Sequence, residues 1–218
     1  MGKDFLAIIF DCSGVVIDSN VHQFFSWKRL FDEEGVPFTM VDFQTKVSGQ
    51  TREAGMRSVM GVVSDGKIEE LCTRKQEIFD QLVAVEVPGP FPGIAQLLAD
   101  LRSRNMLLAV ASSSRNARSL LTRADIARYF DVIAVPESDA LLFSDDLFHR
   151  AVKQLGKKPE QCIVVEDSPM SITEANALGA YTIGIAMITP PEALSHADAV
   201  VANHTELRDL LLHLCTPA

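Results

Sequence analysis

The sequence predicts an α/β protein built on a parallel, doubly wound sheet, with one helical insertion after the first strand. Three observations support this prediction. A short apolar run, residues 5–10, ends at an acidic residue; residues 17–86 carry helical spacing without a strand-like run; and from residue 87 onward strand-like and helix-like patterns alternate. Repeated β-α-β alternation favours a parallel sheet with right-handed crossovers. We therefore expect a core domain of residues 1–16 and 87–218 and a helical domain of residues 17–86.

The first strand, Phe5–Phe10, is a continuous apolar run with aromatic and β-branched members, as expected for a central strand buried on both faces. Asp11 follows at its carboxyl end, and Gly14 closes the turn. Open α/β sheets bind ligands at this end of their strands. A carboxylate there can attack phosphorus or bind a magnesium ion. Alternatively, Asp11 only turns the chain before the glycine, and this stretch alone leaves both interpretations open.

The insertion has apolar residues at helical spacing, for example Phe24, Trp27 and Phe31 on one stripe, which is typical of amphipathic helices. The pattern predicts three helices: His22–Glu34, Thr51–Met60 and Ser64–Leu82. The proline- and glycine-rich segment Val87–Gly93 then suits a hinge that returns the chain to the core.

Beyond this hinge, helix and strand patterns follow one another regularly. A helix with apolar residues from Ile94 to Leu101 precedes the first of four further strands. The predicted strands are Leu107–Ala111, Val132–Val135, Cys162–Val165 and Tyr181–Ile185. The helices between them are Ser119–Arg128, Leu147–Leu155 and Ile172–Leu178, and a last helix begins near Thr205.

The composition restricts the class of partner. The chain of 218 residues has a formal charge of −9, which argues against nucleic acid or an anionic membrane as the main partner, because both require basic patches. Four widely spaced cysteines without a Cys-x-x-Cys pair favour a reducing compartment, and the first apolar run is too short to span a membrane. We expect a cytoplasmic monomer that acts on a small molecule.

Polar residues follow the second predicted strand, where Ser112, Ser114, Arg115 and Asn116 open a helix. Because the carboxyl ends of parallel strands meet in one crevice, these residues should lie near Asp11. Hydroxyls, helix-terminal N–H groups and a guanidinium together make a plausible phosphate site. The alternative is ordinary helix capping by serine.

Paired acids, Glu166 and Asp167, end the strand Cys162–Val165 just before a helix. Two carboxylates that face Asp11 across the crevice repel it unless a cation is present. Magnesium is the economical explanation, so we predict Mg²⁺ as the cofactor. Capping of the following helix by Asp167 or Ser168 is the alternative.

The order and spacing of these motifs resemble the haloacid dehalogenase superfamily, in particular its β-phosphoglucomutases and phosphosugar phosphatases. Other similar segments are Gly14-Val15-Val16, Ser48-Gly49-x-Thr51-Arg52 and Glu166-Asp167-Ser168 followed by Gly179. The resemblance implies a Rossmann-like core with a four-helix cap and a phosphorylated metabolite as substrate. It also implies that Asp11 accepts a phosphoryl group. Further implied roles are Mg²⁺ binding by Asp11, the Ser13 backbone carbonyl, Glu166 and Asp167, and phosphate binding by Arg52, Ser112, Ser114, Arg115 and Asn116.

The chain departs from this family pattern at two positions. The family's second motif aspartate, a general acid/base, is replaced by Ser13, and its charge-neutralising lysine is replaced by Leu142. Serine has no protonation change near neutral pH, so acid–base help of ~10²–10⁴-fold is missing. Leucine cannot stabilise the charge of a transferring phosphoryl group. The family's cap histidine is also replaced, by Gln23.

Two functions from different classes therefore remain open. In the first, the protein is an enzyme with impaired or altered phosphoryl transfer through Asp11. In the second, it is a pseudoenzyme that binds a phosphorylated metabolite or a protein partner. Fold-level similarity does not decide between them.

Overall fold

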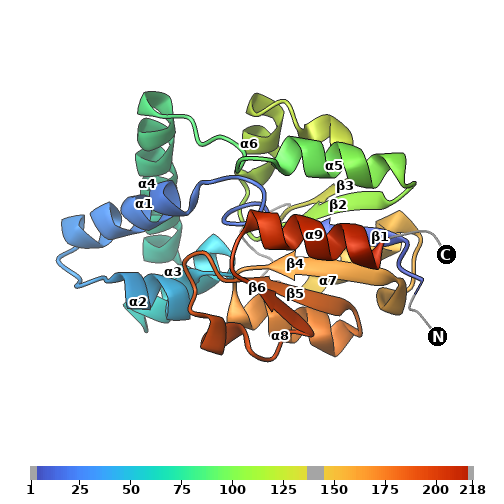
Figure 1. Ribbon diagram of the computed structural model, residues 1–218. Helices are drawn as coiled ribbons and strands as arrows, with labels where there is room; N and C mark the ends of the chain where they lie inside the picture. The colour runs from blue at the N-terminus through green and yellow to red at the C-terminus, as the bar shows by residue number, and fades with distance from the viewer. Residues whose placement is uncertain (1–3, 137–144, 216–218) are drawn as a thin grey trace.

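A six-stranded parallel sheet forms the centre of the molecule (Figure 1). The computed structural model describes residues 4–136 and 145–215. In spatial order the strands are β3 (Val132–Ala134), β2 (Leu107–Ala111), β1 (Ala7–Phe10), β4 (Cys162–Glu166), β5 (Tyr181–Ile185) and β6 (Ala199–Val201). All neighbouring pairs are parallel. The predicted fold class is confirmed, although the sequence analysis missed β6, which has only three residues and one buried side chain.

Helices cover both faces of the sheet because successive strand residues point to opposite sides. Ile8 and Phe10 pack toward one face, and Ala7 and Ile9 toward the other. Helices α5 (Ile94–Ser103), α6 (Ala117–Arg123) and α9 (His204–Leu214) cover the first face, and α7 (Asp145–Leu155) and α8 (Pro169–Leu178) cover the second (Figure 1). Short 3₁₀ turns lie at Ala127–Tyr129, Pro159–Gln161 and Pro191–Leu194. In the described ranges, no helix is long and apolar enough to cross a membrane.

The insertion folds into helices with a hydrophobic core of their own. It contains α1 (Asn20–Glu33), α2 (Met40–Asp42), the π-helix η1 (Phe43–Val47), α3 (Arg52–Met60) and α4 (Asp65–Val85). Trp27, Leu30 and Phe31 of α1 pack with Leu71 and Ile78 of α4 in this core. The three predicted helices are present, whereas α2 and η1 were missed because each is too short to show helical spacing.

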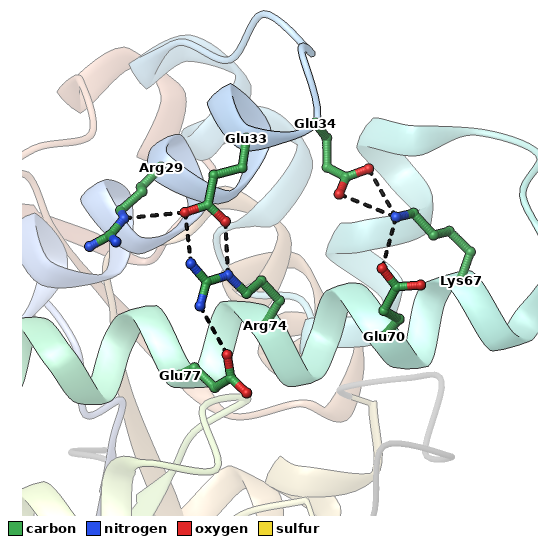
Figure 2. Close-up of polar contacts among 7 residues, drawn as sticks. All are labelled: Arg29, Glu33, Glu34, Lys67, Glu70, Arg74 and Glu77. Atoms are coloured by element: carbon green, nitrogen blue, oxygen red, sulfur yellow. Dashed lines mark hydrogen bonds and ion pairs between the residues drawn. The ribbon is translucent and has the colours of Figure 1, made fainter.

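The solvent-facing side of the α1–α4 contact carries ion pairs (Figure 2). Arg74 pairs with Glu33 at 2.8 Å and with Glu77 at 2.9 Å, and Lys67 pairs with Glu34 at 3.0 Å. Exposed pairs of this kind contribute about 0.2–1 kcal/mol each. The buried aromatic and aliphatic stripe therefore provides most of the free energy that holds these two helices together.

The chain crosses between sheet and insertion twice, and the two crossings are joined to each other. Ile17 forms an antiparallel bridge with Pro90. The Asp18 amide donates to the Gly89 carbonyl at 2.9 Å, and the Phe91 amide donates to the Val16 carbonyl at 3.1 Å. These bonds make the crossings a two-stranded connection rather than two independent linkers.

Candidate active site

The turn after β1 holds Asp11 at the carboxyl edge of the sheet. The Asp11 amide donates to the Val165 carbonyl of β4 at 3.0 Å, and the amides of Val16 and Ile17 both donate to the Cys12 carbonyl. Gly14 has a φ of +85° within this turn, a region that favours glycine. A Cβ at this position would lie 2.1 Å from Asp167 Oδ2. Glycine is therefore required both by the backbone and by the closeness of the β4 loop.

The turn and the end of β4 bring three carboxyl groups together. Oxygen atoms of Asp11, Glu166 and Asp167 lie within 4.8 Å of one another. The backbone amides of Asp167 and Ser168 donate to Glu166 Oε2 at 3.0 and 3.3 Å, which fixes that carboxylate. Glu166 and Asp167 are buried. The structure thus assembles the predicted acidic residues from two neighbouring strands.

Burial raises the pKa of all three acids. The pKa of Asp11 rises to about 7, mainly because of burial and secondly because of the Asp167 charge. Hydrogen bonds from the Ser112 hydroxyl and from the backbone at Cys12 and Ser13 oppose this rise. The pKa of Glu166 is raised by burial and then by the charges of Asp11 and Asp167. The pKa of Asp167 rises to about 6 through burial, partly offset by a hydrogen bond from Asn20.

This donor set fits a hard divalent cation. The three groups offer carboxylate oxygens only, and Mg²⁺ prefers oxygen ligands from one or two carboxylates with water completing the shell. Burial and, for Asp11 and Glu166, the charges of neighbouring acids raise these pKa values, and a bound cation relieves this cost. The residues present therefore suit magnesium, as the sequence predicts.

Ser13 lies on the wall of the same cavity. Its hydroxyl oxygen accepts a hydrogen bond from the Ser19 hydroxyl at 2.9 Å. The Ser13 position thus remains polar and connected to the start of the insertion. Its hydroxyl can donate or accept a hydrogen bond, but it cannot act as a general acid near neutral pH.

The loop after β2 provides the predicted anion-binding residues. Ser112 is buried, and its Oγ accepts from the Ser114 amide at 3.4 Å; Ser114 Oγ in turn accepts from the Asn116 amide at 3.3 Å. The Asn116 Nδ2 group is buried and has no hydrogen-bond partner among the residues that the structure describes. A buried donor of this kind is costly unless a ligand or water satisfies it.

Helices of the insertion close the other side of a cavity of about 70 Å³. Its lining includes Asp11, Asp167 and the 112–116 loop from the sheet side, and Arg52 and Lys75 from the insertion. Gln23 Nε2 donates to Ser114 Oγ at 3.2 Å, and Gln76 Nε2 donates to Asn116 Oδ1 at 2.9 Å. The insertion therefore lies directly against the candidate anion-binding loop.

Lys75 is a basic residue of this cavity that sequence reasoning did not single out. It is buried, its Nζ donates to Gln23 Oε1 at 2.6 Å, and it lies over the rings of Trp27 and Phe79. Burial lowers its pKa well below the usual range, and the nearby Arg52 charge lowers it further. A buried lysine in an otherwise ordinary amphipathic helix leaves no motif, so the sequence offered no signal for it.

An arginine could take the place of the family's lysine, and the structure shows where three nearby arginines lie. Leu142, the residue at the lysine position, lies outside the described residues. Arg118 donates to the Ile133 carbonyl at 2.8 Å and Arg150 to the Val135 carbonyl at 3.4 Å, both at β3. Arg115, in contrast, lines the cavity beside Asn116.

Comparison with known proteins agrees with this geometry. The family model described as haloacid dehalogenase-like hydrolase matches residues 8–185. The chain belongs to this family. The match includes β1 with Asp11 and the acidic end of β4, so the resemblance predicted from the motifs is confirmed.

Curated relatives and a solved structure are similar to the chain over nearly its whole length. It is 30% identical to the β-phosphoglucomutase of Bacillus subtilis (strain 168), with 95% of this chain and 93% of the relative covered. It is 28% identical to the validoxylamine A 7'-phosphate phosphatase of Streptomyces hygroscopicus subsp. limoneus, with 92% and 94% covered. The fold matches a β-phosphoglucomutase from Clostridium difficile with a TM-score of 0.85 at 22% identity, covering 97% of both chains.

Proposed function

We propose that this protein is a Mg²⁺-dependent phosphatase or phosphotransferase that acts on a small phosphorylated metabolite through Asp11. The proposal rests on the cavity, whose lining combines Asp11 and Asp167 of the three-carboxyl cluster with basic and amide side chains that include Arg52, Arg115 and Asn116. The cluster of Asp11, Glu166 and Asp167 suits a cation that would in turn bind the phosphoryl group. Arg52, Lys75 and Arg115, together with the unsatisfied Asn116 amide, suit the anionic remainder of a phosphorylated ligand.

The chemistry starts with in-line attack of an Asp11 carboxylate oxygen on phosphorus. An O–P bond forms to Asp11, and the ester P–O bond breaks with its electron pair on the leaving oxygen. Bound Mg²⁺, held by Asp11, Glu166, Asp167 and the Ser13 carbonyl, would neutralise phosphoryl charge. Water then attacks the same phosphorus, the O–P bond to Asp11 breaks with its electron pair on the carboxylate, and the proton of the water leaves with the phosphate.

Ser13 determines how well this cycle runs. An acid that protonates the leaving oxygen contributes about 10²–10⁴-fold, and Ser13 cannot supply that proton. We therefore expect slow turnover of ordinary phosphate esters and faster turnover when the leaving group needs no proton, as with an acyl phosphate. With Leu142 at the lysine position, charge neutralisation depends on the cation and on groups that line the cavity.

The second candidate is a pseudoenzyme that binds the same ligand without turnover, which the replacements at Ser13 and Leu142 favour. Purified protein with Mg²⁺ and BeF₃⁻ distinguishes the two, because the beryllofluoride adduct mimics a phosphoaspartate. We expect fluorine NMR to detect the adduct in the wild type and not in Asp11→Asn. Binding of glucose 6-phosphate by a wild type that forms no adduct would instead support the binding protein.

From the composition and the resemblance to the family, we also propose that the protein is a cytoplasmic monomer. Residues 1–16 and 87–218 form its core domain, and residues 17–86 form its cap domain.

A further inference from the structure

We propose that Asn20 is a positioning residue that orients Asp167 for cation binding and links the cation site to the first helix of the cap. Asn20 is the first residue of α1, whereas Asp167 follows β4 on the sheet side. Asn20 Nδ2 donates to Asp167 Oδ2 at 2.8 Å, and both residues are buried. The inference rests on the proposed function, because it assumes that Asp167 binds the cation.

The packing around this hydrogen bond leaves little freedom. A Cβ on Gly14 would lie 2.1 Å from Asp167 Oδ2 and 2.3 Å from Asn20 Nδ2. The amide and the carboxylate therefore meet directly over the turn that follows Asp11. Any rotation of the Asp167 carboxylate has to break its bond to Asn20 or displace this turn.

An amide suits this position electrostatically. A hydrogen bond to Oδ2 leaves Oδ1 to face a cation, which favours monodentate binding of the kind that Mg²⁺ prefers. A lysine or arginine would also satisfy Oδ2, but its charge would oppose the cation. The neutral Asn20 amide fixes the carboxylate without this cost, as partners of metal ligands generally do.

The neighbouring residue makes a parallel contact. The Ser19 hydroxyl donates to Ser13 Oγ at 2.9 Å, and Ser19 is fully buried. Two consecutive residues at the start of the cap thus bond to the two loops that carry the candidate ligands. A cation that holds Asp167 in place should therefore also hold the start of α1, and by linkage a displaced α1 should weaken cation binding.

The test measures Mg²⁺ affinity by calorimetry for the wild type, Asn20→Leu, Asp167→Ala and the control Gln44→Leu. Gln44→Leu removes another bond from the insertion to the sheet side, the one to the Ile188 carbonyl, without touching Asp167. We expect Asn20→Leu to weaken Mg²⁺ binding about 10–100-fold and Gln44→Leu to leave it unchanged. Asn20→Ala, which cannot clash, replaces Asn20→Leu if the latter does not fold.

Hydrogen exchange adds a readout that a merely structural role would not affect. Mg²⁺ should slow amide exchange in residues 17–26 of the wild type, and this effect should disappear in Asn20→Leu. Unchanged affinity in Asn20→Leu, with loss in Asp167→Ala, would overturn this inference and leave the proposed function intact. Equal weakening in Asn20→Leu and Gln44→Leu would also overturn it. Unchanged affinity in Asp167→Ala would instead refute the proposed metal site, and this inference with it.

Discussion

Asp11, Glu166 and Asp167 occupy positions where their charged forms are costly. Each is desolvated, and for Asp11 and Glu166 the charges of neighbouring acids add to the cost. The hydrogen bonds from Ser112, from Asn20 and from the backbone after Glu166 offset only part of it. The site therefore stores an unfavourable electrostatic term that a bound cation can remove.

The electrostatic cost of the buried acids predicts how the stability of the metal-free protein depends on pH. Since the pKa of Asp11 rises from 3.8 to about 7 on folding, the native state binds more protons than the unfolded chain in that interval. Stability in EDTA should fall as the pH rises from about 4 to about 7. Urea unfolding of the wild type and of Asp11→Asn isolates the effect, because only the wild type carries this acid.

We expect the stability of the wild type to fall by a few kcal/mol relative to Asp11→Asn over this interval, and added Mg²⁺ to reduce the difference. A constant difference between the two proteins across the interval would show that the Asp11 carboxyl is not desolvated in solution.

Ser13 predicts a gain of function. Ser13→Asp combined with Leu142→Lys restores both the acid/base and the cation while leaving the net charge unchanged. The Ser19 hydroxyl, 2.9 Å from Ser13 Oγ, can donate to the introduced carboxylate. Hydrolysis of an aryl phosphate should rise at least about 100-fold in the double variant and little in either single variant. A folded, Mg²⁺-binding double variant without this gain would favour the pseudoenzyme.

At the scale of elements, α1 and α4 together create the cap side of the cavity. Their shared apolar stripe fixes the spacing of the two helices, and the ion pairs of Figure 2 lie on the solvent side. This arrangement directs Gln23 of α1 and Lys75 of α4 inward, where they bond to each other. The helix pair thus places a buried lysine beside the 112–116 loop, the candidate anion-binding loop.

Lys75→Met tests this role. Methionine has a similar volume and removes the cost of burying a polar amine, although Gln23 Oε1 loses a donor at about 1–3 kcal/mol. We therefore expect a small change in the thermal midpoint but about tenfold weaker binding of glucose 6-phosphate by calorimetry. Lys67→Met on the solvent side of the same helix is the control. Equal affinity in the wild type and Lys75→Met would exclude Lys75 from ligand binding.

At the scale of the whole molecule, the cap is closed against the sheet side. Beyond the contacts at the anion loop, Gln44 Nε2 donates to the Ile188 carbonyl at 3.1 Å and Ser168 Oγ to the Ser48 carbonyl at 3.4 Å. A Cβ on Gly49 would lie 2.4 Å from Ser168 Oγ. We therefore expect ligand entry to involve movement of the cap, with the joined crossings near Ile17 and Pro90 as the pivot.

Cap motion predicts a ligand-dependent change in shape. The radius of gyration from X-ray scattering should decrease when glucose 6-phosphate binds, as open molecules close. Arg52→Ala should weaken binding and reduce this compaction, because Arg52 lines the cavity from the cap. Arg57→Ala is the control, since Arg57 lies on the same helix and pairs with Glu53 and Asp65. If Arg52→Ala has the same affinity and the same ligand-induced change in radius of gyration as the wild type, the cap is not a lid.

The sequence determined the parallel sheet, the helical insertion and the position of Asp11, Glu166 and Asp167 at strand ends. Hydrophobic periodicity and the alternation of strands with helices are local properties, and the parallel topology then places strand ends in one crevice. Ser112, Ser114 and Asn116 could be found for the same reason. Short elements such as α2 and β6 were missed because three residues carry no period.

Only the tertiary structure decided which side chains meet across the cavity. Asn20 and Asp167 are separated by 147 positions, and Gln23 and Lys75 by 52, so no local pattern connects them. Their contacts depend on how far the cap closes and on the packing of α1 against α4. The sequence thus specified the chemistry available at each strand end. The packing of the insertion against the sheet decided the environment of these groups, because burial and the distance to charged or hydrogen-bonding partners set their pKa values.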